Sequence, residues 1–162
     1  KGDLNMKKFT TLLAIISMIL VLTSQPAFAQ SNVISVDIEE LPDGSRFVTV
    51  IENVPTPGIQ PFDRTTETKS KTVYYENSAG KSVWYVRVTG TFTYGDGTAR
   101  CISATPSAAS LDSNWKVSNI TGGKSGNKAT ATATGTHYQN GTARESITKT
   151  VTLTCGPTGM FY

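Results

Sequence analysis

The sequence predicts an all-β fold: an antiparallel β-sandwich, immunoglobulin-like in general architecture only, with one disulfide and an N-terminal β-hairpin. Apolar and polar residues alternate over 82–89, which is the period of a strand with one buried face. Alanine or aliphatic residues alternate with threonine over 128–138 and 147–155. Asp96-Gly97 and Asn140-Gly141 are dipeptides that favour tight hairpin turns.

Residues 6–29 have the pattern of a secretory signal peptide. Lys7 and Lys8 precede an uncharged apolar run over 9–22, and small residues stand at Ala27 and Ala29. We therefore expect cleavage after Ala29 and release outside the cell. An uncleaved membrane anchor is the alternative, although the run is short for a membrane span. Five residues precede Met6, and we interpret them as untranslated leader.

The charge balance argues against a nucleic-acid partner. Without Lys1, Lys7, Lys8 and Asp3, the chain's 15 basic and 12 acidic residues leave a net charge of +1. Nucleic-acid-binding domains carry a basic excess instead. We expect a monomer with no membrane contact after cleavage of the signal peptide.

Two short strands are predicted before the main domain. They cover 33–38 and 47–51 and flank the turn Leu41-Pro42-Asp43-Gly44. A two-stranded hairpin is marginal by itself, so this one must dock on the main sheet or remain mobile. Three prolines after it indicate an extended linker. The predicted organisation is leader 1–5, signal peptide 6–29, hairpin 30–53, Pro/Thr-rich linker 54–70 and β-sandwich 71–162.

A four-residue loop, Ser78–Lys81, joins the first two strands of the main domain. Its length pairs Tyr75 with Trp84 and Val73 with Val86 on an apolar core face. The opposite face receives Tyr74, Tyr85 and Arg87. This trio is a candidate binding patch for sugar rings or for a protein partner. Cover by the N-terminal hairpin or by a second sheet is the alternative.

The second half of the domain continues as strands and loops. The turn at Asp96-Gly97 pairs Phe92 with Cys101 on the aromatic face. Residues 104–113 read as a Ser/Ala loop interrupted by Pro106, 115–120 as a strand, and 121–127 as a glycine-rich loop.

The last hairpin is predicted to turn through a three-residue loop, Gln139–Gly141. A two-residue loop would mix its apolar and threonine faces, whereas three residues keep each face uniform. The threonine face is interpreted as solvent-exposed, with adsorption to a regular polysaccharide surface as the alternative.

The three-residue loop also directs Cys155 toward the core, where Cys101 lies. In an exported chain, two cysteines indicate a disulfide, which would stabilise the fold by about 4 kcal/mol. Two reactive thiols or half of a metal site are the alternatives.

Catalytic signals are few. His137 is the only histidine, and no nucleophile elbow, phosphate loop or calcium loop is present in the sequence. The carboxylates are scattered and mostly near turns. We predict no catalytic residue, no metal site and no cofactor.

The segments VRVTGTFTYGDGTARC, SNWK, KSGNKATATATG and TKTVTLTCGPTG resemble uncharacterised small secreted β-rich proteins of low-GC Gram-positive bacteria. The likeness covers 71–159 and implies a signal peptide, a β-rich domain and a disulfide, but no activity. We expect a secreted, non-enzymatic binding module whose partner is a cell-envelope glycan or another extracellular protein. A bacteriocin-like toxin or accessory factor, or a small hydrolase using Glu76 or Asp112, is the alternative.

Overall fold

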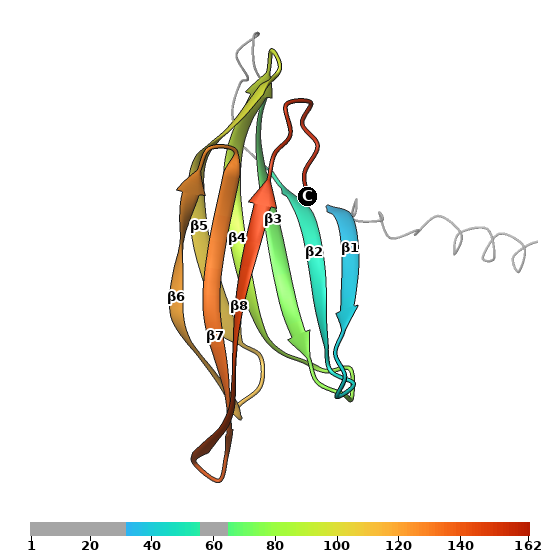
Figure 1. Cartoon of the computed structure of the whole chain (residues 1–162), viewed down its shortest axis with the longest axis vertical. Coiled ribbons are helices and arrows are strands. Elements are labelled where there is room, and N and C mark those ends of the chain that lie inside the picture. Colours follow the sequence, from blue (N-terminus) through green and yellow to red (C-terminus); the bar gives the residue numbers. More distant parts are fainter. Residues whose placement is uncertain (1–31, 56–64) are drawn as a thin grey trace, which may run out of the picture. The chain divides into compact units, whose positions relative to one another are not determined.

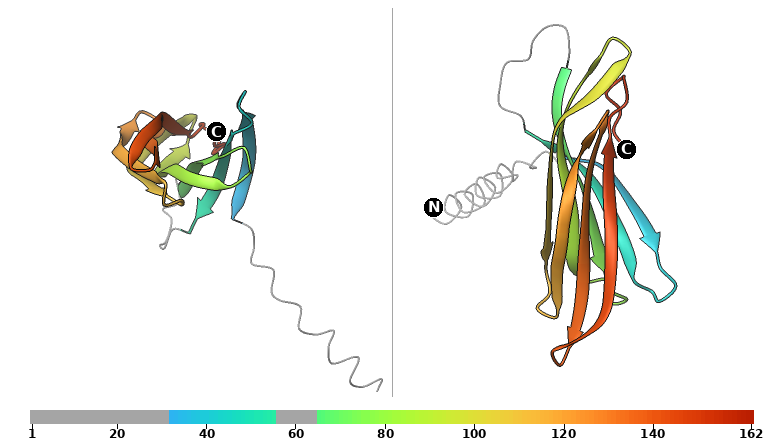
Figure 2. Two further views of the ribbon diagram at one scale, coloured as in Figure 1. Left: turned by 90° about the horizontal axis from the view of Figure 1, so that it is seen from below. Right: turned by 60° about the vertical axis from the view of Figure 1, so that its left-hand side comes forward.

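The computed structural model describes residues 32–55 and 65–162. The predicted leader and signal peptide lie outside the described residues. The described chain is all-β, as predicted, and its strands form two antiparallel sheets packed face to face (Figures 1 and 2). The larger sheet contains β1 (Val33–Glu40), β2 (Arg46–Val54), β3 (Thr65–Glu76), β4 (Ser82–Gly95) and β5 (Thr98–Ser110). The smaller sheet contains β6 (Trp115–Ser125), β7 (Lys128–Gln139) and β8 (Thr142–Thr154).

Each strand pairs with its neighbours in sequence, so each sheet is a meander. Immunoglobulin domains instead use Greek-key connections. The likeness to them therefore stops at two packed antiparallel sheets. Short turns join the paired strands other than β2 and β3, and antiparallel neighbours need only such a tight connection.

The core lies between the two sheets. The larger sheet contributes aromatic and branched side chains, and β7 contributes a row of alanines. The buried core residues are Phe47, Ile51, Val73, Tyr75, Val83, Trp84, Val86, Val88, Phe92, Cys101, Trp115, Ala129, Ala131, Ala133, Val151, Leu153 and Cys155. Large side chains facing small ones allow the sheets to interdigitate at high packing density.

At Gly135, the backbone of β7 lies directly against an aromatic ring of the larger sheet. A Cβ at this position would lie 2.4 Å from Cε2 of Trp84. The Trp84 side chain is fully buried, and its Nε1 has no hydrogen-bond partner among the described residues. Position 135 therefore requires glycine to admit the indole.

The two long sides of the sandwich differ. On the closed side, along β5 and β6, the Cys101 N–H of β5 donates to Gly126 O in the β6–β7 turn at 2.8 Å and so joins the two sheets. On the open side, along β1 and β8, β8 lies against β3 and β4 but no strand of the smaller sheet lies against β1 or β2. Figure 1 shows β1 at the free edge of the larger sheet.

The N-terminal hairpin joins the main domain through strand pairing between β2 and β3. β2 pairs with β3 from Arg46–Glu76 to Val54–Thr68, so the hairpin extends the larger sheet. Because β3 begins at Thr65, the linker prediction is wrong for 65–70. The segment 56–64 lies outside the described residues.

Two predicted loops are strands. Residues 104–110 complete β5, and 121–125 complete β6. Pro106 is tolerated because β5 is the last strand of its sheet, where one edge needs no ladder hydrogen bonds. Pairing with β4 overrides the weak strand propensity of the Ser/Ala run.

In the last hairpin, each face of the sheet is uniformly apolar or uniformly threonine-lined, but the turn that produces this differs from the predicted one. Its turn has two residues, Asn140 at φ 52° and Gly141 at φ 76°, with Gln139 opposite Thr142. A bulge then shifts the register between His137 and Tyr138, and Ala133 pairs with Lys149. The three-residue loop is wrong, because the extra residue sits in the bulge beside the turn.

The predicted disulfide is absent, since Cys101 and Cys155 are buried free thiols. The β6–β7 turn binds the backbone of both cysteines. Gly126 O accepts from Cys101 N–H, and Asn127 O accepts from Cys155 N–H at 3.0 Å. Each sulfur instead lies near a local carbonyl, Cys101 Sγ 3.1 Å from Ser103 O and Cys155 Sγ 3.4 Å from that of the next residue. Burial raises the pKa of both thiols, that of Cys155 to about 11.

Candidate functional site

The face of the larger sheet that points away from the core carries an apolar patch. Strand register places Ile38, Val48, Tyr74 and Tyr85 side by side across β1 to β4. Val36 and Val50 form a neighbouring pair on the same face. Val36 is 57% exposed and Ile38 50% exposed, and the other four are half-buried. We call these six residues the outer apolar patch.

The three residues predicted as a binding patch lie together. Tyr74 and Tyr85 belong to the outer apolar patch, and Arg87 lies beside it. The ring centroids of Tyr74 and Tyr85 are 5.8 Å apart, with planes inclined at 48°. The Arg87 Cζ lies 5.9 Å from the Tyr85 centroid. Arg87 Nε donates to Thr72 Oγ1 at 2.7 Å, and its Nη2 lies 3.4 Å from Glu52 Oε2. Arg87 therefore forms a neutralised rim, and the apolar surface dominates.

Sequence reasoning missed the four aliphatic members of the patch. The signal was present as Val and Ile at alternating positions of β1 and β2, but it was assigned to a separate hairpin. The expectation that this hairpin or a second sheet covers Tyr74 and Tyr85 is wrong for the described residues. The hairpin lies beside the two rings in the same sheet, and the smaller sheet packs on the other face.

The outer face of the smaller sheet has a different chemistry. Threonine hydroxyls bond across β7 and β8, with Thr132–Thr150 at 2.8 Å and Thr134–Thr148 at 2.9 Å. The hydroxyls thus satisfy one another at a surface that water also reaches. This fits a solvated face, on which methyl groups are interspersed with hydroxyls and no continuous apolar row is formed.

A groove of about 480 Å³ opens on the open side of the sandwich. β1, β2 and β3 form one wall, and β8 with the C-terminal Phe161 and Tyr162 forms the other. Ile51, Val73 and Val151 contribute apolar surface, and Lys71 and Asp37 contribute charge. Its volume falls within the range of small-molecule sites.

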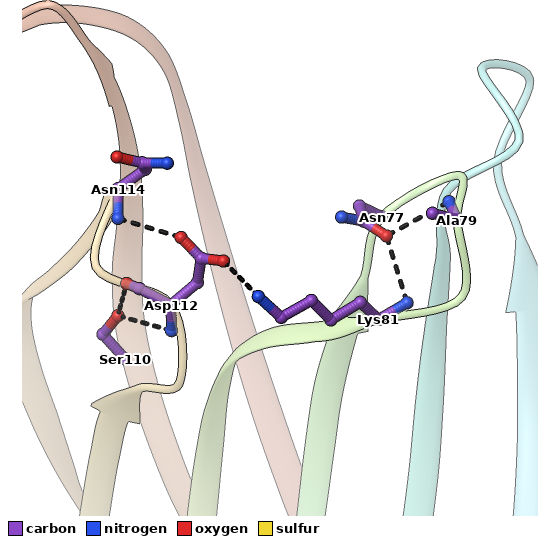
Figure 3. Close-up of polar contacts among 6 residues, drawn as sticks. All are labelled: Asn77, Ala79, Lys81, Ser110, Asp112 and Asn114. Carbon is purple, nitrogen blue, oxygen red and sulfur yellow. Dashed lines mark hydrogen bonds and ion pairs between the residues drawn. The ribbon is translucent and has the colours of Figure 1, made fainter.

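The two carboxylates considered for hydrolysis are partners of basic groups. Glu76 accepts from Arg46 Nε at 2.7 Å and from Ser82 Oγ at 3.0 Å, and the bond from Arg46 lowers its pKa. Asp112 lies 2.6 Å from Lys81 Nζ and accepts from Asn114 N–H at 2.9 Å (Figure 3).

The bond from Lys81 likewise lowers the pKa of Asp112. A general acid needs the opposite shift. The Lys81–Asp112 pair instead ties the β3–β4 turn to the β5–β6 turn, as Figure 3 shows.

His137 stacks on Trp115, with ring centroids 5.2 Å apart and planes inclined at 19°. Within 32–55 and 65–162, no three His, Cys, Asp or Glu side chains are grouped as metal ligands. The described part of the chain also contains no helix long and apolar enough to span a bilayer.

Neither a protein-family model, nor a curated protein, nor a solved structure gives a significant match to this chain. The resemblance to small secreted proteins of low-GC Gram-positive bacteria therefore stays a prediction.

Proposed function

We propose that the protein is a non-enzymatic binding module that works outside the cell and docks on a protein partner through the outer apolar patch. The observation behind this proposal is a continuous apolar row across four strands with nothing described above it. Contiguous exposed apolar surface on a small protein marks an interaction site. The extracellular location rests on the signal-peptide pattern of 6–29.

The shape of the patch favours a protein over a glycan. Sugar rings stack on flat aromatic surfaces, whereas the planes of Tyr74 and Tyr85 are inclined at 48°. The patch continues from these rings onto aliphatic side chains of β1 and β2. Tyrosine beside aliphatic residues, with an arginine at the rim, is typical of the centre of a protein–protein interface.

The test measures retention of the purified protein on cell envelopes isolated from the producing organism. Tyr85→Ala and Val36→Ser are each expected to weaken retention about tenfold, because central interface residues contribute more than 1 kcal/mol. Thr148→Ser on the smaller sheet is the matched control and should bind like the wild type. The free energy of unfolding should stay within about 1 kcal/mol for all three.

Pretreatment of the envelopes separates the two partner classes. Protease should remove the binding, and glycan-digesting enzymes should leave it in place. Loss with glycan digestion alone would replace the protein partner with a glycan. Retention unaffected by Tyr85→Ala, or a loss of stability that parallels the loss of binding, would reject the patch as a docking site.

A further inference from the structure

The groove on the open side has two ends that are closed by side chains. At one end Lys149 reaches from β8 to β1, its Nζ 2.8 Å from Glu39 Oε2 and 3.8 Å from the centroid of Phe47. At the other end Phe161 packs edge-on against Phe92, with ring centroids 5.3 Å apart. The space between them is a groove that is open to solvent and has the volume of a small molecule.

Two opposite charges face this groove. Lys71 on β3 and Asp37 on β1 both line it, and neither forms a hydrogen bond or an ion pair with another described residue. The neighbouring Lys69, in contrast, is paired with Glu67 at 2.8 Å. Burial lowers the pKa of Lys71, and the negative charge of Asp37 partly opposes this shift.

A half-buried ammonium is costly when no hydrogen bond replaces the water it has lost, and Asp37 acts on Lys71 only through space, without an ion pair between them. An anionic group bound there would replace the missing hydrogen bonds. The unpaired Asp37 in the same groove would accept hydrogen bonds from a cation. A single ligand that carries an anionic and a cationic group therefore supplies a hydrogen-bond partner to Lys71 and to Asp37 at the same time.

Part of the groove wall is apolar, and the threonines of β2 and β8 contribute polar surface beside it. Ile51 and Val73 on the larger sheet and Val151 on β8 are buried core residues that also line the groove. A ligand body of hydrocarbon would extend the core there and gain hydrophobic stabilisation.

We propose that the open-side groove binds a small zwitterion with an apolar body, of the class of apolar amino acids and dipeptides. Its carboxylate lies on Lys71, its ammonium on Asp37, and its side chain against Ile51, Val73 and Val151. This site is independent of the outer apolar patch, which lies on the opposite face of the larger sheet.

The experiment titrates the protein with L-phenylalanine and follows backbone amide signals by NMR. We expect saturable shifts in β1, β3 and β8, with a dissociation constant of about 1 mM or tighter. Two matched probes each lack one charge: 3-phenylpropionate has no ammonium, and 2-phenylethylamine has no carboxylate. Each should bind several-fold more weakly than phenylalanine.

Variants that each remove one charge show which protein side chain binds the carboxylate of the ligand and which binds its ammonium group. Lys71→Met should weaken the binding of phenylalanine and of 3-phenylpropionate at least tenfold, since both lose a hydrogen bond from a charged donor. Asp37→Asn should weaken phenylalanine but leave 3-phenylpropionate unchanged. Lys128→Met, at an exposed position of β7, should bind like the wild type.

Asp37 lies on the exposed edge strand, so Asp37→Asn keeps the fold and decides the question by itself. Equal binding of all three probes, absence of saturable shifts, or phenylalanine binding that survives Asp37→Asn would overturn the proposal.

Discussion

The closed and open sides of the sandwich are built from opposite kinds of residue. Near the closed side, small residues of β7 allow β4 to approach closely, and the backbone hydrogen bond from Cys101 to Gly126 joins the sheets. On the open side, long lysines replace the small residues, and contact between β8 and β1 depends on a side-chain ion pair. Backbone contact gives rigidity, whereas a spacing set by flexible charged side chains leaves room for a ligand. The same all-β pattern thus produces a packed side and an accessible one.

The largest effect is expected for a substitution that disrupts the close packing of β7 against β4. Gly135→Ala places a methyl group against the rigid Trp84 indole and should reduce the free energy of unfolding by about 3 kcal/mol. Gly123→Ala on β6 is the control, because a Cβ there meets nothing within 4 Å. Urea unfolding should show a clear loss for the first variant and little change for the second. Equal midpoints would mean that the sheets adjust freely and that the closed side is not rigid.

A second effect concerns the thiols beside the β6–β7 turn. Burial raises the pKa of Cys155 from 9.0 to about 11, so the folded protein holds its proton more tightly than the unfolded chain. Stability is therefore fully present below pH 9 and is lost as the pH rises toward 11, by on the order of 2 kcal/mol.

Urea midpoints measured between pH 8 and pH 11 check this, and Cys155→Ala should show a flatter decline than the wild type. Parallel declines would indicate that the thiol does not titrate, as in a disulfide. Thiol titration of the unfolded chain should independently find both cysteines free.

The smallest effect is expected on the open side. Lys149→Met removes the ion pair with Glu39 and the contact over Phe47, and should reduce stability by less than about 1 kcal/mol. Glu39→Gln should cost less, and its effect should fade in high salt because the pair is partly exposed. A loss as large as that of Gly135→Ala would show that both sides are equally important for the fold.

Local pairing was predictable from the sequence. Tyr74 opposite Tyr85, Val73 opposite Val86 and Phe92 opposite Cys101 all follow from turn length and alternation, and the structure confirms them. These pairs are separated by short loops, so few registers are available.

Features without such local constraints were predicted less well. The Ser/Ala run of β5 has weak strand propensity and becomes a strand only because β4 offers an edge. The last hairpin has uniform faces in both the prediction and the structure, yet a bulge at His137–Tyr138 achieves this rather than a longer turn. Turn and bulge are alternative solutions to the same face pattern, so the pattern does not choose between them.

The amino-acid sequence by itself determined that the chain forms antiparallel strands, where most of them turn, and which side chains share a face. These properties depend on neighbours in the chain and on the two-residue period of a strand. Only the tertiary structure decided that the N-terminal hairpin extends the larger sheet, which joins Val36 and Ile38 to Tyr74 and Tyr85. It also decided that Lys71 and Asp37 face one groove, because alternation does not specify which sheet edges meet and which remain apart.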